Sequence, residues 1–452
     1  MEKKSILTNI SRPSISADII ADAIREGILT FKEAQETGEF HLTKQKLVKD
    51  LLATHAKEDT DFNNASSLPL LIEFIEKYPN SKYKDSIAVK IREKEAVERE
   101  KQRQKFEKIK NNINDYKPDE IKNELGDELL RHLCRELGID YDVVNNYDEP
   151  ELKFNEIPQD TGDIPHGFTD VFFWGIPSSG KTCALSAILC TMKDNYTITS
   201  PTIEKKFGAT YRDSLINIFK NQTAYLPAAT QKDRTQYMPF LLKRRNEDKY
   251  RQISFFELSG EVFKYLHELE NNSTILDEID RGYVESAFKT LNLLLGSKNQ
   301  KIHFFFIDYQ QETKGTRDKH NLTQENYLNA AATYFRDRDD IFKKKTDAVY
   351  VVVTKSDMIT SVDKNKNNIS GEERTQLASK FLSDNFGNFM DVIKHRCKKD
   401  SVDFNVKIFS IGDVFFKSIC KLNYYYTTNI VEDLLKKVKP VSENRITKWF
   451  NS

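Results

Sequence analysis

The sequence has little that would suit a membrane or a polyanion. No apolar run among its 452 residues approaches the roughly 20 residues that a spanning helix needs. Charge of one sign is not in excess either, since 69 Lys and Arg residues face 69 Asp and Glu residues and the formal net charge is zero. A chain that binds nucleic acid or an anionic surface normally carries a basic excess. We therefore expect no membrane span and no strong nucleic-acid interaction.

Cysteine and histidine are also scarce, and neither is patterned. The five cysteines are scattered without a C-x-x-C pair, and the eight histidines show no H-x-x-x-H spacing. The first residues, MEKKSILTNISRPS, lack the apolar core of a signal peptide. These absences argue against a zinc site or a disulfide framework, and we expect a cytoplasmic protein.

The first third of the chain carries helical patterns. Apolar residues recur at helical spacing near the N-terminus, and Thr30 followed by Glu33 predicts a capping box. The words EFIEKYPNSKY resemble one tetratricopeptide-type helical hairpin, and charges of both signs fill 92–111, as in a solvated helical spacer. The polar stretch 59–67 predicts a loop, and Pro118 predicts the start of another helix.

The stretch VFFWGIPSSGKTCALSAIL, residues 171–189, has the pattern of a buried strand, a glycine-rich loop and a helix. It fits G-x-x-x-x-G-K-[ST], with Gly175, Gly180, Lys181 and Thr182 in the fixed places. Glycines let backbone N–H groups surround a phosphate, and the helix N-terminus adds partial positive charge. The pattern predicts that Lys181 reaches the β- and γ-phosphates of a nucleotide and that the Thr182 hydroxyl holds Mg²⁺.

Strands and helices alternate after this loop. Strands are predicted within MPFLLKR (238–244), QISFFELSG (252–260), KIHFFFIDY (301–309), DAVYVVVTKSD (347–357) and FNVKIFSIG (404–412). Long helices are predicted at 321–344 and 372–397, and a closing helix at 428–438. This alternation predicts a mostly parallel sheet that binds its ligand at the carboxyl ends of the strands.

Several motifs close successive strands in a fixed order. The GxxxxGKT loop is followed by ExxG at Glu257–Gly260, by TKSD at Thr354–Asp357 and by SIG at Ser410–Gly412. This order resembles the guanine-nucleotide-binding proteins of the Ras-like, translation-factor-related class, and within it the divergent bacterial GTPases joined to helical adaptor domains. The resemblance implies GTP or GDP with Mg²⁺ as ligands. It also implies a nucleotide-dependent switch, read out by a protein partner through the helical N-terminal region.

The chain is therefore expected to have five parts. They are a small helical module at 1–58, a helical hairpin and charged spacer at 59–140, a linker at 141–165, a P-loop GTPase domain at 166–440 and a tail at 441–452. The predicted fold class is α/β, a P-loop NTPase domain with a mostly parallel central sheet, preceded by an all-α N-terminal region.

The resemblance also implies which residues bind the nucleotide. The phosphate and base contacts would come from Gly175, Ser178, Ser179, Gly180, Lys181, Thr182, Cys183, Gly260, Thr354, Lys355, Asp357, Ser410 and Ile411. Asp357 would accept two hydrogen bonds from guanine, which adenine cannot donate. Magnesium would be held by Thr182, by Glu257 and by a threonine of the first switch. Thr230 is our first choice for that threonine and Thr235 the second.

Two positions depart from the family pattern and bear on hydrolysis. Glu257 stands where the family has Asp, and Glu261 stands where well-known members carry a water-orienting Gln. An ionised carboxylate cannot donate a hydrogen bond and is repelled by a γ-phosphate. We therefore expect slow Mg²⁺-dependent hydrolysis, with Lys181, Thr230 and Glu261 as the catalytic set. A trans-acting Arg could add about 10³–10⁵ in rate. Within this chain, Arg234 is a candidate for the same catalytic role, although an ordinary exposed Arg in a loop is the simpler interpretation.

Other classes stay open. TILDEID (274–280) and FFFID (304–308) both resemble the acidic strand end of ATPases of the STAND or AAA+ kind, and FFFID is the better strand. A scaffold that binds nucleotide without turnover is a further alternative. The thiol of Cys183, just inside the helix after the phosphate loop, could have a lowered pKa there, although packing in the core is the simpler interpretation.

Overall fold

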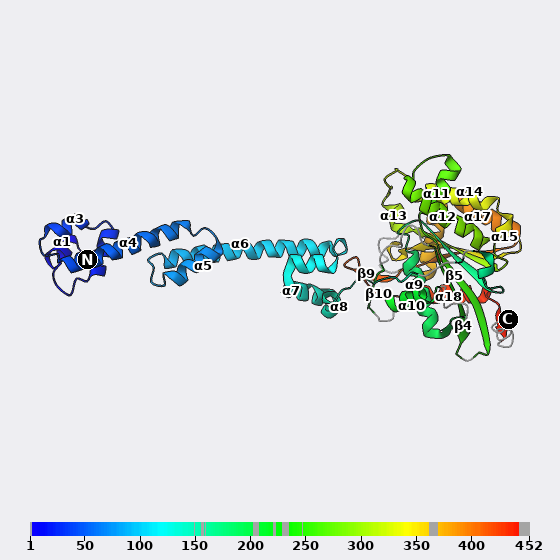
Figure 1. The fold of residues 1–452 in the computed structure, drawn as a ribbon, viewed down its shortest axis with the longest axis horizontal. Helices are drawn as coiled ribbons and strands as arrows, with labels where there is room; N and C mark the ends of the chain where they lie inside the picture. Colours follow the sequence, from blue (N-terminus) through cyan, green and yellow to red (C-terminus); the bar gives the residue numbers. More distant parts are fainter. Residues whose placement is uncertain are drawn as a thin grey trace. The chain divides into compact units, whose positions relative to one another are not determined.

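The computed structural model describes all residues except 1, 149, 155–157, 159, 202–207, 220–222, 228–234, 246, 361–368 and 443–452. The chain divides into two compact units, Met1–Asn111 and Asn112–Ser452 (Figure 1). Within the described ranges, no helix has the length and apolar character that a membrane span requires.

Among its described residues, the first unit consists of helices joined by short turns and loops, without strands. Its helices are α1 (Lys3–Thr8), α2 (Ala17–Arg25), α3 (Phe31–Glu36), α4 (Leu42–Asn64), α5 (Leu68–Lys77) and α6 (Lys84–Asn111). The predicted capping box is confirmed, because the Thr30 side chain accepts from the Glu33 N–H while the Glu33 carboxylate accepts from the Thr30 N–H. The charged run at 92–111, which the sequence assigns to a solvated helix, forms the C-terminal part of α6.

The predicted loop at 59–67 is wrong for residues 59–64, because α4 continues to Asn64, and only 65–67 connect α4 to α5. The polar side chains of this stretch have tertiary partners that a helix positions. Asp59 pairs with Arg25 and accepts a 2.8 Å hydrogen bond from the Tyr83 hydroxyl. Asp61 accepts one of 2.8 Å from the Tyr78 hydroxyl. A polar run predicts a loop only when its side chains are solvated, and here they fasten α4 to α2 and to the α5–α6 hairpin.

The second unit begins with helices and continues into the α/β domain. The leading elements are a 3₁₀ turn, η1 (Ile113–Asp115), then α7 (Pro118–Leu137), α8 (Tyr141–Asn145) and a second 3₁₀ turn, η2 (Thr161–Asp163). Helix α7 starts at Pro118 as predicted, and its backbone leaves helical geometry at Gly126, where φ is +76°. Helix α8 occupies the first residues of the stretch that we expected to be a linker.

A large sheet forms the centre of the domain. Its strands are β1 (Thr169–Trp174), β2 (Tyr196–Thr199), β4 (Gln236–Arg244), β5 (Lys249–Glu257), β6 (Gln300–Asp308), β7 (Thr346–Thr354), β8 (Asp403–Ile408) and β11 (Pro440–Ser442). The order is β2-β4-β5-β1-β6-β7-β8, with β11 also paired to β5. The strands from β5 to β8 run parallel, and β2, β4 and β11 pair antiparallel with their neighbours. This sheet, together with the helical N-terminal region, confirms the predicted fold class.

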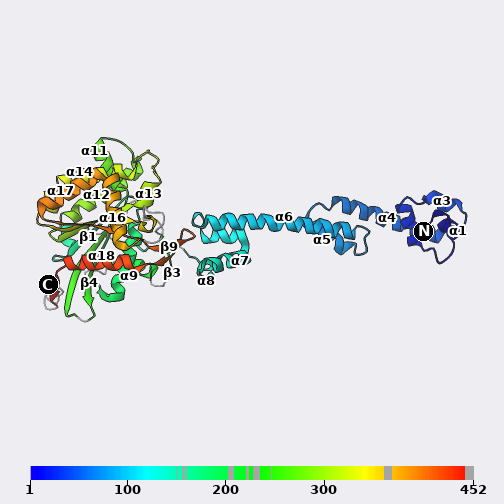
Figure 2. The same ribbon diagram turned by 180° about the vertical axis from the view of Figure 1, so that it is seen from behind.

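Helices cover both faces of this sheet, which buries every residue of β1 (Figures 1 and 2). The helices are α9 (Lys181–Asn195), α10 (Ala209–Ile218), α11 (Val262–Asn271), α12 (Glu278–Leu295), α13 (Tyr309–Thr313), α14 (Gln324–Arg336), α15 (Asp339–Phe342), α16 (Gly371–Asn385), α17 (Gly387–Asp400) and α18 (Tyr424–Lys437). Helix α9 packs with α10 and α18 in one layer, and α11, α12, α14 and α17 pack in the other.

Two helices predicted as continuous are each broken. The segment 321–344 holds α14 and α15, and the segment 372–397 holds α16 and α17. The second break falls at Phe386, whose φ is −131° and whose side chain is fully buried. The break lets α16 pack on β8 while α17 packs on α14, so tertiary packing overrides a continuous helical pattern.

The sequence patterns did not predict a second, smaller sheet. It consists of β3 (Thr223–Tyr225), β10 (Ile419–Leu422) and β9 (Gly412–Phe415), all antiparallel. The β9–β10 turn has positive φ at Phe416 and Lys417, +53° and +57°. Turn positions with positive φ are normally occupied by Asn or Gly. This turn has neither, so the sequence gives no recognisable signal for the hairpin.

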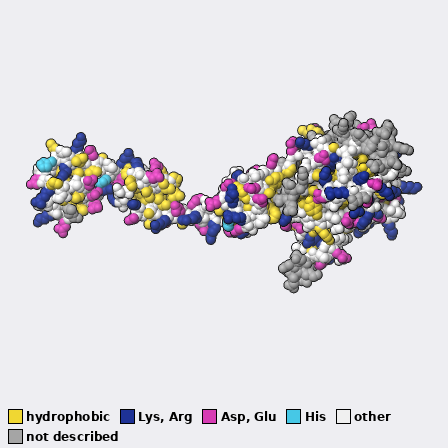
Figure 3. Space-filling view, turned by 90° about the horizontal axis from the view of Figure 1, so that it is seen from below, with side chains coloured by type: hydrophobic (Ala, Val, Ile, Leu, Met, Phe, Trp, Pro, Cys, Tyr) yellow, Lys and Arg dark blue, Asp and Glu magenta, His cyan; other side chains and the backbone are white. Residues whose placement is uncertain are grey.

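On the face drawn in Figure 3, basic and acidic side chains are interspersed.

Candidate functional site

The order of the strands places a ligand site at the carboxyl end of β1. After β1 the chain forms β5 on one side and later β6 on the other, and such a switch point leaves a crevice beyond the strand ends. A cavity of about 270 Å³ lies there. Its lining comes from the phosphate loop and the start of α9, from the end of the ExxG motif with the residue after it, and from one further proline. These residues are Pro177, Ser178, Ser179, Gly180, Lys181, Thr182, Cys183, Pro227, Ser259, Gly260 and Glu261.

The loop between β1 and α9 has the backbone geometry for which its glycines are needed. A Cβ on Gly175 would lie 2.6 Å from Ser179 Oγ and 2.9 Å from the Phe306 carbonyl oxygen. Gly180 caps α9 with φ +82°, in the region that side chains disfavour. The hydroxyl of Ser179 is buried and has no hydrogen-bond partner among the described residues. The loop therefore places backbone N–H groups, a helix N-terminus and one unsatisfied hydroxyl around the cavity.

Lys181 is folded back onto this loop. Its Nζ donates to the carbonyl oxygens of Gly175 at 2.6 Å and Ile176 at 2.9 Å. Burial lowers the pKa of Lys181 to about 8, against the opposing charges of Glu257 and Glu261. A cation that burial penalises in this way is stabilised by any anion that enters the cavity.

The two described residues predicted to hold magnesium are in contact. The Thr182 hydroxyl donates to one carboxylate oxygen of Glu257, which lies fully buried at the end of β5. The hydroxyl of Tyr211, from α10, donates to the other oxygen. Burial and the charge of Glu257 raise the pKa of Tyr211 well above its usual 10, so this phenol stays protonated. Magnesium is commonly held by one or two protein oxygens plus phosphate and water, and this oxygen pair fits that requirement.

Sequence reasoning missed Tyr211 because it lies in a poorly patterned segment. The first-choice switch threonine, Thr230, and the candidate Arg234 lie outside the described residues. The second choice, Thr235, immediately precedes β4, whose first residue pairs with Glu257. Its hydroxyl is buried without a partner in the described part of the chain. Thr235 is therefore the chain neighbour of the residue that pairs with the predicted magnesium carboxylate.

The ExxG glycine packs directly on the phosphate loop. A Cβ on Gly260 would lie 2.3 Å from the Pro177 nitrogen and 2.7 Å from the Ile176 carbonyl carbon. The next residue, Glu261, is buried, lines the cavity and forms a 2.7 Å ion pair with Lys264 of α11. Lys264 was not predicted. The i,i+3 spacing within the following helix was the signal that could have identified it.

The predicted base-binding residues lie at the same edge of the sheet. The Thr354 hydroxyl donates to the Ser179 carbonyl oxygen at 2.9 Å, which joins the TKSD motif to the phosphate loop. Ser410 donates to the Asp357 carboxylate at 2.6 Å, so the third and fourth motifs also meet. Lys355, Asp357, Ser410 and Ile411 do not line the 270 Å³ cavity, whose described lining stops at Cys183 on that side.

The acids of the two rival motifs are occupied elsewhere. Asp308, at the end of β6, forms a 2.6 Å ion pair with Lys355 and caps α13 through the Gln311 N–H at 3.0 Å. Asp277, from the TILDEID segment, caps α12 through the Asp280 N–H at 2.8 Å. The carboxylate that accepts from the Thr182 hydroxyl belongs to Glu257 of β5, whereas the described contacts of Asp308 are with Lys355 and the start of α13.

For Cys183 the structure favours the simpler interpretation, a packed thiol, over a thiol with a lowered pKa. Burial, reinforced by the negative charge of Glu257, raises the pKa of its thiol to about 12. The helix N-terminus does not outweigh the loss of hydration, so Cys183 is a protonated packing residue rather than a reactive thiolate.

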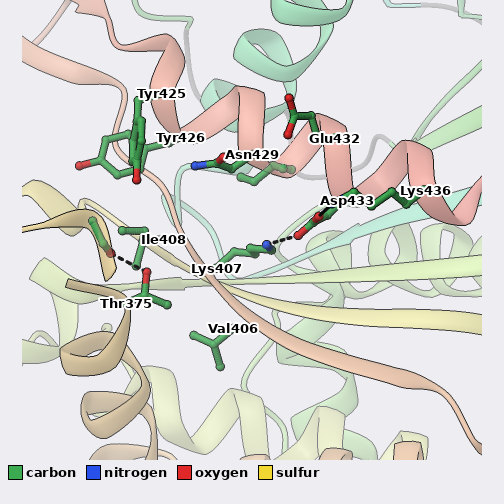
Figure 4. Close-up of a pocket in the computed structure, with 12 residues that line it drawn as sticks. Thr375, Val406, Lys407, Ile408, Tyr425, Tyr426, Asn429, Glu432, Asp433 and Lys436 are labelled. Carbon is green, nitrogen blue, oxygen red and sulfur yellow. Dashed lines mark hydrogen bonds and ion pairs between the residues drawn. The ribbon is translucent and has the colours of Figure 1, made fainter. Parts of the chain in front are cut away.

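A second cavity, of about 220 Å³, lies between α16, β8 and α18, and no motif residue is among the described residues that line it (Figure 4). Lys407 points toward Asp433 there, and Lys436 pairs with the same carboxylate at 2.7 Å. Glu432 also lines this cavity, so its two lysines are matched by two carboxylates and its lining carries no net charge.

No family model and no curated protein sequence matches the chain. Among solved structures, it is similar to the S. cerevisiae Ski7 GTPase-like domain bound to GTP, with 14% identity over 63% of this chain and 54% of that chain and a TM-score of 0.29. The same domain bound to GDP and inorganic phosphate matches with 13% identity, coverages of 61% and 52% and a TM-score of 0.27. The chain spans about half the length of these structures. Such a likeness concerns the fold alone.

Proposed function

We propose that the second unit is a guanine-nucleotide-binding domain of the Ras-like, translation-factor-related class that binds Mg²⁺·GTP and hydrolyses it slowly. The observation that carries this proposal is the hydrogen bond from Thr354 to the Ser179 carbonyl oxygen. It fastens the motif that would recognise a base to the loop that would hold phosphates. One nucleotide could therefore reach both.

The phosphate end of the site is supported by complementary charge. The loop N–H groups and Lys181 would receive the phosphates, and the pKa of Lys181 would rise when the ammonium gains an anionic partner. Thr182 and Glu257 would hold Mg²⁺, which would supply charge neutralisation at the phosphates. Glu257 ends β5 and Thr182 lies in the first turn of α9, and their hydrogen bond joins the two elements.

The base end favours guanine over adenine. Asp357 would accept hydrogen bonds from the base, and the Ser410 hydroxyl holds this carboxylate at 2.6 Å. Lys355, fixed by Asp308, would lay its aliphatic stem along the base plane. Adenine presents no matching donors, so its binding would leave the carboxylate without base partners, which costs affinity. This arrangement favours a GTPase over an ATPase of the STAND or AAA+ kind.

Slow hydrolysis follows from the residue beside the γ-phosphate position. Glu261 lines the cavity as a carboxylate paired with Lys264, and an ionised carboxylate has no hydrogen to donate to an attacking water. We further propose that the helical region at 1–140 reads out the bound nucleotide to a protein partner. A scaffold that binds without turnover would show the same affinities and no release of phosphate in multiple turnover.

Isothermal titration of GTP, GDP and ATP with Mg²⁺ tests the proposal. Wild type should prefer guanine nucleotides, and Asp357→Asn should weaken GTP by about 10–100-fold, the worth of a hydrogen bond to a charged group. Binding of ATP should hardly change. Asp413→Asn is the matched control, because Asp413 is an exposed carboxylate on β9. Equal affinities for GTP and ATP in wild type would refute guanine recognition.

A further inference from the structure

Three consecutive residues at the end of β3 contact three different parts of the second unit. Pro227 lines the phosphate cavity. The Leu226 N–H donates to the Ser418 carbonyl oxygen, in the turn between β9 and β10, at 2.5 Å. The Tyr225 hydroxyl donates to the Val143 carbonyl oxygen at 2.8 Å and lies 3.2 Å from that of Asn146. The wall of the candidate site, the small sheet and α8 therefore meet within a single tripeptide.

The Tyr225 hydroxyl donates a hydrogen bond to a carbonyl group near the C-terminal end of α8. The last carbonyl groups of a helix have no partner within the helix, and an outside donor satisfies them. One phenol has one hydrogen, so Tyr225 can bond Val143 or Asn146 but not both at full strength. Its ring also packs edge-on against Tyr147 with centroids 5.1 Å apart. The position of Tyr225 therefore determines which carbonyl group at the end of α8 is satisfied.

Helix α8 is in turn fastened to α7. Lys122 donates to the Asn145 side chain at 2.6 Å, and the Arg131 guanidinium lies over the Tyr141 ring, 3.9 Å from its centroid. A shift of α8 would therefore change contacts made by both halves of α7, on either side of the kink at Gly126.

The base end of the candidate site reaches β3 by a second route. Gly412 is the last residue of the SIG motif and the first of β9, and its N–H lies 3.3 Å from the Ser410 oxygen that bonds Asp357. A Cβ on Gly412 would lie 1.9 Å from the Lys421 carbonyl oxygen, so β9 is pressed against β10. Strand β10 then pairs with β3, with Ile419 opposite Tyr225. Both ends of the site therefore converge on Tyr225 through short, packed connections.

We infer that the small sheet β3–β10–β9 couples the nucleotide site to the α7–α8 helices, and that Tyr225 is the positioning residue that carries this coupling. The inference rests on the proposed function, since it needs a ligand in the site. A phosphate group that displaces Pro227, or a base that draws on Asp357 and Ser410, shifts the strand that presents Tyr225 to α8. The helices then report occupancy of the site. By linkage, a change at α8 alters nucleotide affinity by the same factor.

Hydrogen exchange of the full chain, with and without Mg²⁺·GTP, tests this inference. Exchange of the amides at 141–147 should change by about five-fold or more in wild type, the lower range for coupled sites. Tyr225→Phe keeps the ring and removes the hydroxyl, so its α8 should respond less than about two-fold. Tyr350→Phe is the matched control, because it loses another hydroxyl bond to a carbonyl group, at Asp433, away from β3. Its α8 should respond like wild type.

Titration of the same samples with GTP separates the inference from the proposed function. If neither protein binds nucleotide, the proposed function fails and the inference fails with it. If wild type binds and α8 does not respond, or if Tyr225→Phe responds like wild type, the inference alone is refuted. Lys122→Met removes the hydrogen bond between α7 and α8 and so tests the coupling from α8 to α7. Its α8 should still respond, while the response at 118–137 should shrink.

Discussion

The close packing of Gly260 on the phosphate loop makes the sharpest prediction. A methyl group at this position would lie 2.3 Å from the Pro177 nitrogen and 2.7 Å from the Ile176 carbonyl carbon. Both are backbone atoms, so no side chain can rotate away, and either β5 or the loop must shift. Overpacking of this kind costs about 1–3 kcal/mol. Gly260→Ala should lower the free energy of unfolding of the second unit by that amount.

The same shift should weaken nucleotide binding. The phosphate loop would have to return to its original position to bind, so a comparable 1–3 kcal/mol would appear as about 5–150-fold lower affinity for GTP. Gly282→Ala is the matched control. Gly282 is exposed within α12, and a Cβ there meets nothing within 4 Å. Alanine in a helix is favoured over glycine by about 0.8–1 kcal/mol, so this variant should be slightly stabilised and bind normally.

Urea unfolding, followed by circular dichroism and by tryptophan fluorescence, measures the stabilities, and isothermal titration measures GTP affinity. Trp174 is fully buried at the end of β1, next to the loop, and should report its displacement. If Gly260→Ala unfolds at the same urea concentration as wild type and binds GTP equally well, the contact between the ExxG motif and the phosphate loop does not have the energetic role inferred here.

Two further predictions concern charged residues of the site. Burial lowers the pKa of Lys181 from 10.5 to about 8, so the unfolded chain holds more protons between these values and the free energy of unfolding should rise with pH across this window. Lys181→Met should remove that part of the rise in the free energy of unfolding. It should stabilise the nucleotide-free protein by up to about 3 kcal/mol at pH 7 and abolish GTP binding. Identical pH profiles of stability for wild type and variant would contradict this prediction. Glu261→Gln should accelerate single-turnover GTP hydrolysis by about ten-fold, because the amide can donate to water. Lys264→Met breaks the same ion pair without supplying a donor and should not accelerate it, and a wild type as fast as Glu261→Gln would refute the argument.

Local patterns were enough to predict most strands and the fold class. The alternation of apolar strands with helices identifies the centre of the large sheet, because burial on both faces makes β1, β6 and β7 largely apolar runs. The capping box at Thr30 was also predictable from local sequence, because both of its hydrogen bonds join residues three positions apart. The polar stretch at 59–67 misled because its partners, such as Arg25, lie far away in the sequence.

In the candidate site, too, local sequence predicts some residues, and tertiary packing alone identifies the others. Gly175, Gly180, Lys181 and Thr182 could be proposed from the sequence because the phosphate loop is one contiguous stretch whose backbone requirements are local. Tyr211 could not, since it meets Glu257 across 46 residues. The ion pair between Lys355 and Asp308, 47 residues apart, exists only because β6 and β7 are neighbours in the sheet.

The sequence by itself determined the loop between β1 and α9, the alternation of strands and helices, and the order of the motifs along the chain. Only the tertiary structure decided which acid meets Thr182, what holds Lys355 and Glu261, and that β3 joins β9 and β10 beside α8. The reason is physical: backbone conformation and burial periodicity are written in neighbouring residues, whereas partners chosen by strand order are brought together from distant parts of the chain by packing.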